Sequence, residues 1–376
     1  MNYHFIGEDA IPSPALIYYR DPIEANTRLT VRMAGDPERL WPHIKTHKMA
    51  QMLKMQLSTG IHRFKCATYQ ELLLACESGA TDCLWAYPVV GPNVERFLSL
   101  MEEFPRVHLY ALADDLDTCA LLGKAALARK RTASVLVDVN MGMNRTGIAP
   151  ERLYDAYRAL SALPGVSVRG MHCYDGHIHD HDLNERLAHA DACARPVFAV
   201  RDALIRDGLD VGIMIMGGTP TFPCHARRPG VFLSPGTLFV SDAGYAAAFP
   251  DIPVVPAAAV LTRVISHPAD GLFTLDTGYK AVSADPVGAR GQLAGYEALC
   301  DDVLSSEEHW VFRMRPGHEH KRPSIGSVLY VIPTHICPTT CLYDAAYVVS
   351  DGRLCDLWPV AARDRVHMQP DREALS

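Results

Sequence analysis

The sequence predicts an α/β protein with an N-terminal (β/α)₈ barrel of the TIM type and a C-terminal β domain. Strand-like and helix-like segments alternate from residue 12 to residue 248, and this region has the length of a barrel. From about residue 250 the helical periodicity disappears, and short β-rich segments follow one another. A doubly wound sheet is the main alternative, but no GxGxxG motif follows the first strands.

Segments with helical character separate the expected strands of the barrel. A strand and a polar helix at 12–30 come first. The eight barrel strands then follow at the segment that contains Lys45 and at 63–68, 83–87, 107–111, 134–140, 166–174, 211–216 and 231–240. Helices are expected at 49–57, 69–78, 94–101, 115–130, 151–163 and 183–207. In the third of these, apolar residues recur at i, i+3, i+4 and i+7, as on one face of an amphipathic helix.

The second domain is expected to consist of short strands joined by turns. The strands are predicted at 254–265, 272–276, 310–314, 327–332 and 347–349, and Ser350-Asp351-Gly352-Arg353 is typical of the turns. We therefore place the barrel domain at residues 12–248 and the β domain at residues 249–376. Residues 1–11 could join the β domain.

Composition and charge exclude several classes of protein. The chain has 376 residues, of which 48% are hydrophobic and 21% charged, so it can bury a large core. A net charge of −7 and a pI near 6.2 give no electrostatic footprint for nucleic acid. The N-terminus lacks the basic start and apolar run of a signal peptide, and no segment has the length of a membrane span. Eleven cysteines without a CxxC pair favour reduced thiols, and we expect a cytoplasmic protein.

The segment Trp41–Lys48 has the strongest functional character. An apolar start and a proline are followed by His43, Lys45, His47 and Lys48. A lysine at the mouth of a buried strand predicts an amine that its surroundings keep nucleophilic, as Schiff-base chemistry requires. Short basic clusters are also common on surfaces, so a basic strand end that faces water is the alternative.

Two loops at the expected carboxyl ends of the strands could bind anionic groups. Gly217, Gly218 and Thr219 follow the seventh strand, where glycines let backbone N–H groups approach an anion and the threonine adds a hydroxyl. Arg145 follows the fifth strand and could face a phenolate or a carboxylate. The alternatives are an ordinary tight turn and a surface arginine.

Two groups of residues could hold a metal or move protons. His172, His177, His179 and His181 lie at the end of the sixth strand, although a partly buried structural role is the alternative for His172. In the β domain, His335 and Cys337 are two residues apart. On an extended chain both side chains would point to the same face and could hold one cation with open positions for water and substrate.

These motifs, taken together, resemble one family. In chain order they are Pro42-His43-Ile44-Lys45-Thr46-His47-Lys48, Met143-Asn144-Arg145-Thr146-Gly147, Gly217-Gly218-Thr219, Ser234-Pro235-Gly236-Thr237, Ser306-Glu307-Glu308-His309 and Pro333-Thr334-His335-Ile336-Cys337-Pro338-Thr339. The chain is similar over nearly its whole length to the D-threonine aldolase and D-serine dehydratase group of pyridoxal-phosphate enzymes, of fold type III, and more distantly to alanine racemase. The resemblance implies a head-to-tail homodimer whose active site lies between one subunit's barrel and the partner's β domain.

The resemblance also implies roles for individual residues. Lys45 corresponds to the Schiff-base lysine, with Lys48 as a supporting residue. Arg145 would lie near the phenolic oxygen of the cofactor, and Gly217, Gly218 and Thr219 would hold its phosphate. The residues implied for the substrate side are Tyr174 and either His177 or His179. His335 and Cys337 would bind a divalent metal, zinc or manganese, and the soft thiolate favours zinc.

The function implied is that of a lyase dependent on pyridoxal 5'-phosphate and a divalent metal. Its substrate would be a small D-β-hydroxy-α-amino acid of the D-threonine type, cleaved by retro-aldol reaction to glycine and an aldehyde. The alternative is a D-serine or D-3-hydroxyaspartate dehydratase, which forms a 2-oxo acid and ammonia. A racemase and a non-catalytic pyridoxal-phosphate carrier are further alternatives.

Overall fold

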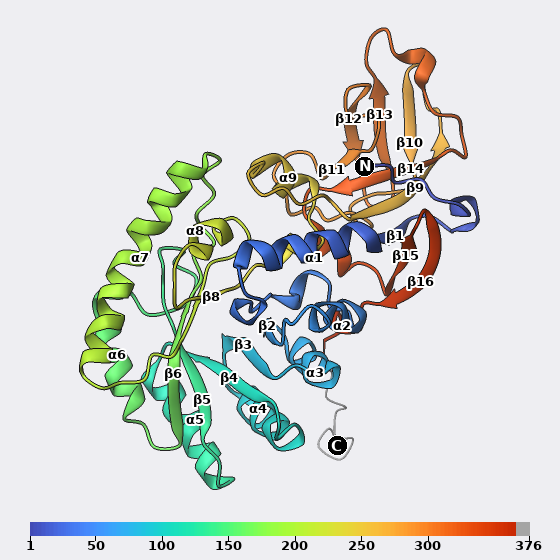
Figure 1. Ribbon diagram of the computed structural model, residues 1–376. Helices are drawn as coiled ribbons and strands as arrows, with labels where there is room; N and C mark the ends of the chain where they lie inside the picture. Colours follow the sequence, from blue (N-terminus) through green and yellow to red (C-terminus); the bar gives the residue numbers. More distant parts are fainter. Residues whose placement is uncertain (366–376) are drawn as a thin grey trace, which may run out of the picture.

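The computed structural model describes residues 1–365 and contains two β-sheets in two domains (Figure 1). One sheet has seven parallel strands in sequence order, and helices surround it. The other has nine strands and includes the C-terminal part of the chain. The predicted barrel and the predicted β domain are therefore both present, and the predicted fold class is confirmed.

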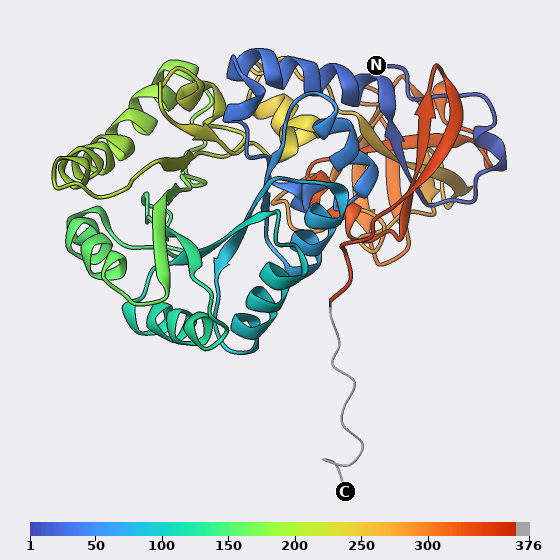
Figure 2. The same cartoon turned by 60° about the horizontal axis from the view of Figure 1, so that its bottom comes forward.

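The barrel sheet runs in the order β2-β3-β4-β5-β6-β7-β8, with every pair parallel. Its strands are β2 (Arg63–Cys66), β3 (Asp82–Pro88), β4 (His108–Ala113), β5 (Ala133–Asp138), β6 (Val166–Cys173), β7 (Ile213–Met216) and β8 (Phe232–Leu233). In Figure 2 the helices form a ring outside these strands. The carboxyl ends of all seven strands consequently meet at one end of the barrel.

The segment 40–43 closes the barrel between β8 and β2. Leu40 forms an isolated parallel bridge with Leu233, and His43 forms one with Lys65. The backbone N–H of Lys65 donates to the carbonyl of Pro42 at 2.9 Å. Proline has no N–H to return to a ladder, which explains why the predicted first strand is an irregular segment. The chain then continues into a short 3₁₀ helix, η3 (Ile44–Thr46), rather than a strand.

Aromatic and aliphatic side chains fill the barrel below this end. The indole of Trp41 packs against the rings of Tyr110 and Phe232, with ring centroids 5.7 and 6.2 Å apart. Leu84 and Leu136 belong to the same buried cluster. The interior is thus a packed core rather than a channel, as in other barrels of this kind.

Ten α-helices lie within the described chain, most of them between the barrel strands. They are α1 (Arg20–Ala34), α2 (Ala50–Leu57), α3 (Tyr69–Ser78), α4 (Pro92–Glu103), α5 (Leu116–Ala128), α6 (Pro150–Ser161), α7 (Leu183–Arg206), α8 (Phe222–Ala226), α9 (Ala243–Ala248) and α10 (Ile336–Thr340). Thr68, Asp115 and Asp182 cap α3, α5 and α7 by accepting backbone N–H groups of the first turn. Across residues 1–365, none of the helices is both long and apolar enough to cross a membrane.

The β domain contains the predicted C-terminal strands and one N-terminal strand. Its strands are β1 (Ala15–Tyr19), β9 (Ala258–Ser266), β10 (Leu272–Leu275), β11 (Gly291–Leu293), β12 (Cys300–Ser305), β13 (Trp310–Met314), β14 (Val328–Pro333), β15 (Ala345–Ser350) and β16 (Arg353–Pro359). β1 pairs antiparallel with β9 and parallel with β15. The barrel therefore begins after β1, in α1, rather than at residue 12 as the sequence predicted.

Further differences from the prediction concern short or exposed segments. The expected strand at 231–240 is reduced to two residues, and Pro235 is followed by the 3₁₀ helix η4 (Thr237–Phe239). Strands β11, β12 and β16 were not predicted. β12 and β16 are largely exposed edge strands, so their residues lack the apolar pattern of a core strand.

Gly170 provides a test of how closely β6 and β7 approach each other. At its φ of +149°, a Cβ atom would lie 1.8 Å from the carbonyl oxygen of Ile213. We expect Gly170→Ala to lower the melting temperature by about 5 °C or more, since the clash is with backbone. Gly212→Ala is the matched control, because its Cβ would meet only the end of the Asp210 side chain, at 3.1 Å. Equal melting temperatures for the two variants would contradict this packing.

Candidate active site

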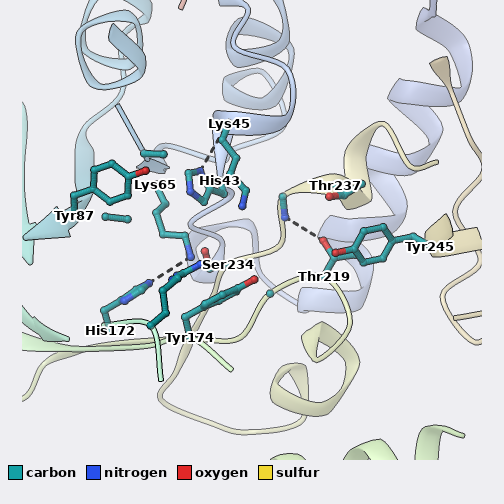
Figure 3. Close-up of a pocket in the computed structure, with 15 residues that line it drawn as sticks. His43, Lys45, Lys65, Tyr87, His172, Tyr174, Thr219, Ser234, Thr237 and Tyr245 are labelled. Atoms are coloured by element: carbon teal, nitrogen blue, oxygen red, sulfur yellow. Dashed lines mark hydrogen bonds between the residues drawn. The ribbon is translucent and has the colours of Figure 1, made fainter. Parts of the chain in front are cut away.

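A cavity of about 200 Å³ opens at the carboxyl ends of the barrel strands (Figure 3). Its lining includes residues from the segment around η3, from β2, and from the loops after β5, β6, β7 and β8. Three cationic side chains line it, those of Lys45, Lys65 and Arg145, and no carboxylate among residues 1–365 does so. The charge of the lining therefore favours an anionic ligand.

Lys45 reaches the cavity from η3. His43 caps this short helix, with its Nδ1 3.3 Å from the backbone nitrogen of Lys45. Burial, together with the charges of Lys45 and Lys65, lowers the pKa of the His43 imidazole well below its usual value. The neighbour of the Lys45 amine is consequently a neutral imidazole.

The loops after β7 and β8 form a cradle that contains two close-packed glycines. A Cβ atom at Gly217 would lie 2.8 Å from the ring of His225, and one at Gly218 would lie 2.9 Å from the ring of Tyr174. The hydroxyl of Thr219 accepts the N–H of Gly236 at 3.2 Å, which joins the two loops. Close approach of backbone and hydroxyl groups is the arrangement that binds phosphate.

The hydroxyl of Ser234 is an unsatisfied group beside this cradle. Its Oγ is buried and has no hydrogen-bond partner within the described part of the chain, and Ser234 lines the cavity. Buried polar atoms are nearly always paired, so an unpaired hydroxyl at a cavity wall favours a polar ligand there. The amine, the cradle and this hydroxyl together fit a phosphorylated aldehyde cofactor.

Asp175 supports the cradle through hydrogen bonds to Thr221 and His225, a role that sequence reasoning missed. Its two carboxylate oxygens lie 2.7 Å from the hydroxyl of Thr221 and 2.6 Å from Nε2 of His225, and all three residues are buried. Thr221 Oγ1 in turn accepts the N–H of Gly218 at 3.2 Å. The position of Asp175, two residues after the end of β6, was the available signal, whereas no local pattern pointed to His225.

Tyr174 lies between two cations at the edge of the cavity. Its ring centroid is 4.8 Å from the guanidinium carbon of Arg145 and 5.3 Å from Nζ of Lys65. The structure thus brings together Lys45, Arg145 and Tyr174, three of the residues predicted from the sequence. Such cation–π contacts hold the ring and the cations in place.

Lys65 is a second cavity lysine, which the sequence analysis treated only as part of a strand. Its Nζ is 3.4 Å from Nε2 of His172, and Nδ1 of His172 is 2.7 Å from Asp138 Oδ1. Burial is the main cause that lowers the pKa of Lys65 to about 7, and the charges of Lys45 and Arg145 add to it. An inward position on β2 could have identified this residue, because side chains on a barrel strand alternate between inside and outside.

Lys48 does not line the cavity, so the supporting role implied for it is indirect. It has a positive φ of 56° and forms a buried ion pair with Glu71 of α3. Glu71 also accepts the backbone N–H of Ala67 at 2.6 Å. Lys48 therefore fixes α3 and the end of β2 to the segment that carries Lys45.

The structure places the two predicted substrate-side histidines away from the cavity lining. His177 lies against α7, where its ring faces His189 and Cys193. His179 is exposed, and its ring is 6.4 Å from that of Phe249. Their catalytic role stays a prediction from the sequence.

His335 and Cys337 lie at the junction of the two domains. They are not on an extended chain as predicted, because His335 caps α10 and Cys337 is inside that helix. Cys337 Sγ is 3.2 Å from the hydroxyl of Thr46 and 3.4 Å from that of Thr237. Cys337 thus packs against the barrel of its own chain.

The chemistry of this pair fits a divalent metal. Burial opposes both shifts, but the imidazole and the thiol stabilise each other's charge, which raises the pKa of His335 to about 9 and lowers the pKa of Cys337. Asp285 Oδ2 lies 2.5 Å from Nδ1 of His335. A thiolate beside an imidazole that a carboxylate orients is a donor set that zinc proteins use.

Two protein-family models match this chain. The model of the alanine racemase N-terminal domain matches residues 19–233, and that of a putative serine dehydratase domain matches residues 257–349. This chain belongs to the alanine racemase N-terminal domain family. Within the family, the first match covers the barrel, and the second covers most of the β domain, including His335 and Cys337.

Relatives of this family are similar over nearly the whole chain. The D-threonine aldolase of Arthrobacter sp is 30% identical over 364 residues, which cover 94% of this chain and 93% of that protein. The D-threo-3-hydroxyaspartate dehydratase of Delftia sp. is 24% identical over 375 residues, or 93% and 97% of the two chains. The crystal structure of D-threonine aldolase from Filomicrobium marinum has a TM-score of 0.86 at 26% identity and covers 96% of this chain and 98% of that one. The predicted membership of the aldolase and dehydratase group is confirmed.

The buried amine of Lys65 predicts a pH-dependent effect on stability. The unfolded lysine keeps its proton up to about pH 10.4, while the folded one loses it near pH 7, so its burial destabilises the fold most below pH 7. This destabilisation of the folded state disappears as the pH rises toward 10. We expect Lys65→Met to raise the melting temperature more at pH 6 than at pH 9, as measured by thermal unfolding. Lys54→Met, an exposed lysine on α2, is the control, and a pH-independent difference for Lys65→Met would contradict the prediction.

Proposed function

We propose that this chain is a lyase that depends on pyridoxal phosphate and a divalent metal and acts on D-β-hydroxy-α-amino acids. The observation that carries the proposal is the position of the Lys45 amine, in a cationic cavity bordered by the Thr219 cradle and by Thr237, which contacts Cys337. The names of the family's relatives support it, since they include a D-threonine aldolase and two 3-hydroxy-D-aspartate aldolases. Retro-aldol cleavage to glycine and an aldehyde is the proposed reaction.

The residues of the cavity have distinct tasks in holding the cofactor. Lys45 Nζ would hold it covalently, while the Thr219 and Gly236 loops would bind its phosphate and the Ser234 hydroxyl would meet one of its polar atoms. Bound pyridoxal phosphate supplies an electron sink for the negative charge that develops at the substrate's Cα. Arg145 places a permanent positive charge at the cavity edge, where it can pair with an oxygen anion.

The aldolase and the dehydratase reactions differ in the proton that this chain must move. Aldol cleavage requires loss of the β-hydroxyl proton, and dehydration requires loss of the Cα proton. His43 and His172 are the imidazoles that line the cavity, and burial is the main cause that lowers the pKa of each. Both are therefore neutral. His172 is already bonded to Asp138 and Lys65, and His43 accepts the backbone N–H of Lys45, so neither ring is a free base for the hydroxyl proton. Lys45 Nζ is the candidate for the Cα proton.

His335 and Cys337 would hold the divalent metal, and we propose zinc because thiolate is a soft ligand. A bound divalent metal supplies a Lewis acid for a substrate oxygen. The Delftia dehydratase supports a metal, since a mutant of that protein has been solved in a metal-free form. Cys337 contacts Thr46, the residue that follows Lys45, so metal and cofactor would act on the same substrate.

Dehydration of D-serine or D-3-hydroxyaspartate is the second candidate. The Delftia relative, a D-threo-3-hydroxyaspartate dehydratase, matches nearly the whole chain. The His335 and Cys337 pair is compatible with either reaction, because a polarised hydroxyl can lose its proton or leave as hydroxide.

We also propose that the protein is a cytoplasmic homodimer. All eleven cysteines are free thiols, which supports a reducing compartment.

A product assay tests the proposed reaction. We expect the purified protein, supplied with pyridoxal phosphate and Zn²⁺, to convert D-threonine to glycine and acetaldehyde. The variant Lys45→Met should lose this activity together with the absorbance of the lysine-bound cofactor. Glycine, aldehyde, 2-oxo acid and ammonia would be measured together with D-threonine, D-serine and D-3-hydroxyaspartate. Ammonia and a 2-oxo acid as the products would replace the aldolase by the dehydratase, and no product from any substrate would refute both.

The metal assignment has its own test. We expect Cys337→Ser to reduce activity by more than about 100-fold and to lower the metal content, while the cofactor's absorbance stays. Cys341→Ser is the matched control, because Cys341 ends the same helix without contacting Thr46 or Thr237. Full activity after dialysis against a strong chelator would exclude a catalytic metal.

A further inference from the structure

A second group of soft metal ligands lies outside the catalytic cavity. His177 in the loop after β6 faces His189 and Cys193, which are one turn apart on α7. One ligand atom from each residue lies within 4.8 Å of the others. The i, i+4 spacing puts the two α7 residues on the same face of the helix. None of the three residues lines the catalytic cavity.

The hydrogen bonds around the cluster leave its imidazoles available. Nδ1 of His189 lies 2.9 Å from Asp180 Oδ2, so its Nε2 remains for another partner. Nδ1 of His177 is buried without a hydrogen-bond partner in the described chain, and its Nε2 has only a weak contact, 3.9 Å from Cys193 Sγ. Buried polar groups are normally paired. Nε2, the ring nitrogen that faces Cys193, is therefore available to bind a cation.

We propose that His177, His189 and Cys193 form a second divalent-metal site that binds zinc. Two imidazoles and one thiolate are typical zinc ligands, and the half-buried location leaves a fourth position for water. Tetrahedral zinc places a nitrogen and a sulfur ligand about 3.6 Å apart, so the 3.9 Å between His177 and Cys193 needs little adjustment. The carboxylate of Asp180 orients His189 as outer-shell carboxylates orient zinc-binding histidines.

The site would act on the catalytic cavity by fixing its loops. The loop that contains His177 also contains Tyr174, which lines the cavity, and Asp175, which supports the cradle. The loop after β5, which carries Arg145, packs on the same histidine, because a Cβ at Gly142 would lie 2.9 Å from His177 Nε2. Zinc would connect both loops to α7. The three ligands are thus positioning residues, and the proposal does not depend on the reaction that the cavity catalyses.

Metal analysis of the full-length holoenzyme tests the proposal. In a Cys337→Ser background, which removes the metal proposed for the cavity, we expect about one zinc per chain. Adding Cys193→Ser should remove that zinc, whereas adding Cys355→Ser, an exposed cysteine on β16, should leave it. Zinc-free Cys337→Ser protein, or unchanged zinc after Cys193→Ser, would overturn the proposal.

Cobalt substitution gives a result even if the Cys193 variant does not fold. We expect cobalt-loaded Cys337→Ser protein to show a thiolate-to-cobalt charge-transfer band, and His189→Gln to lose it. Absence of the band from the cobalt-loaded Cys337→Ser protein would by itself refute thiolate ligation at this cluster. A band that survives His189→Gln unchanged would place the metal elsewhere.

Discussion

The site depends on how the segment 40–46 closes the barrel between β8 and β2. Backbone bridges hold Leu40 to Leu233 and His43 to Lys65, and Pro42 prevents a continuous ladder. The chain therefore turns into η3 at the mouth of the barrel. This turn directs Lys45 into the cavity and leaves Thr46 in contact with the β domain. A regular strand would have continued along the barrel wall instead.

The electrostatics of the cavity follow from pairing inside the barrel. Asp138 and Asp175 are buried acids close to the cavity, and each is bonded to a histidine and a threonine. These hydrogen bonds occupy the two carboxylates, neither of which lines the cavity. The cationic side chains of Lys45, Lys65 and Arg145 do line the cavity. The result is a cavity that favours anions, as a phosphorylated cofactor and an amino-acid carboxylate require. The same crowding of cations adds to the effect of burial in lowering the pKa of Lys65.

The two domains share both a strand and a site. β1 precedes the barrel in sequence but lies in the sheet of the β domain, so the chain crosses between the domains at each end of the barrel (Figure 1). Cys337 returns to the barrel through its contacts with Thr46 and Thr237. The relative position of the domains thus sets the separation between the amine of Lys45 and the pair His335 and Cys337. Neither domain alone contains both.

The fold class, the family and the motifs that meet at the cavity could all be predicted from the sequence. Regular alternation of strands and helices predicts a barrel, and a barrel brings the ends of its strands together, so Lys45, Arg145 and Thr219 could be placed at one site in advance. The pairing of side chains from different elements became visible only in the folded chain. The role of His225 and the separation of His177 from the cavity depend on contacts between residues distant in sequence, which no local pattern encodes. β1 was misplaced for the same reason, because strand pairing across the whole chain, and not its own residues, decides the sheet it joins.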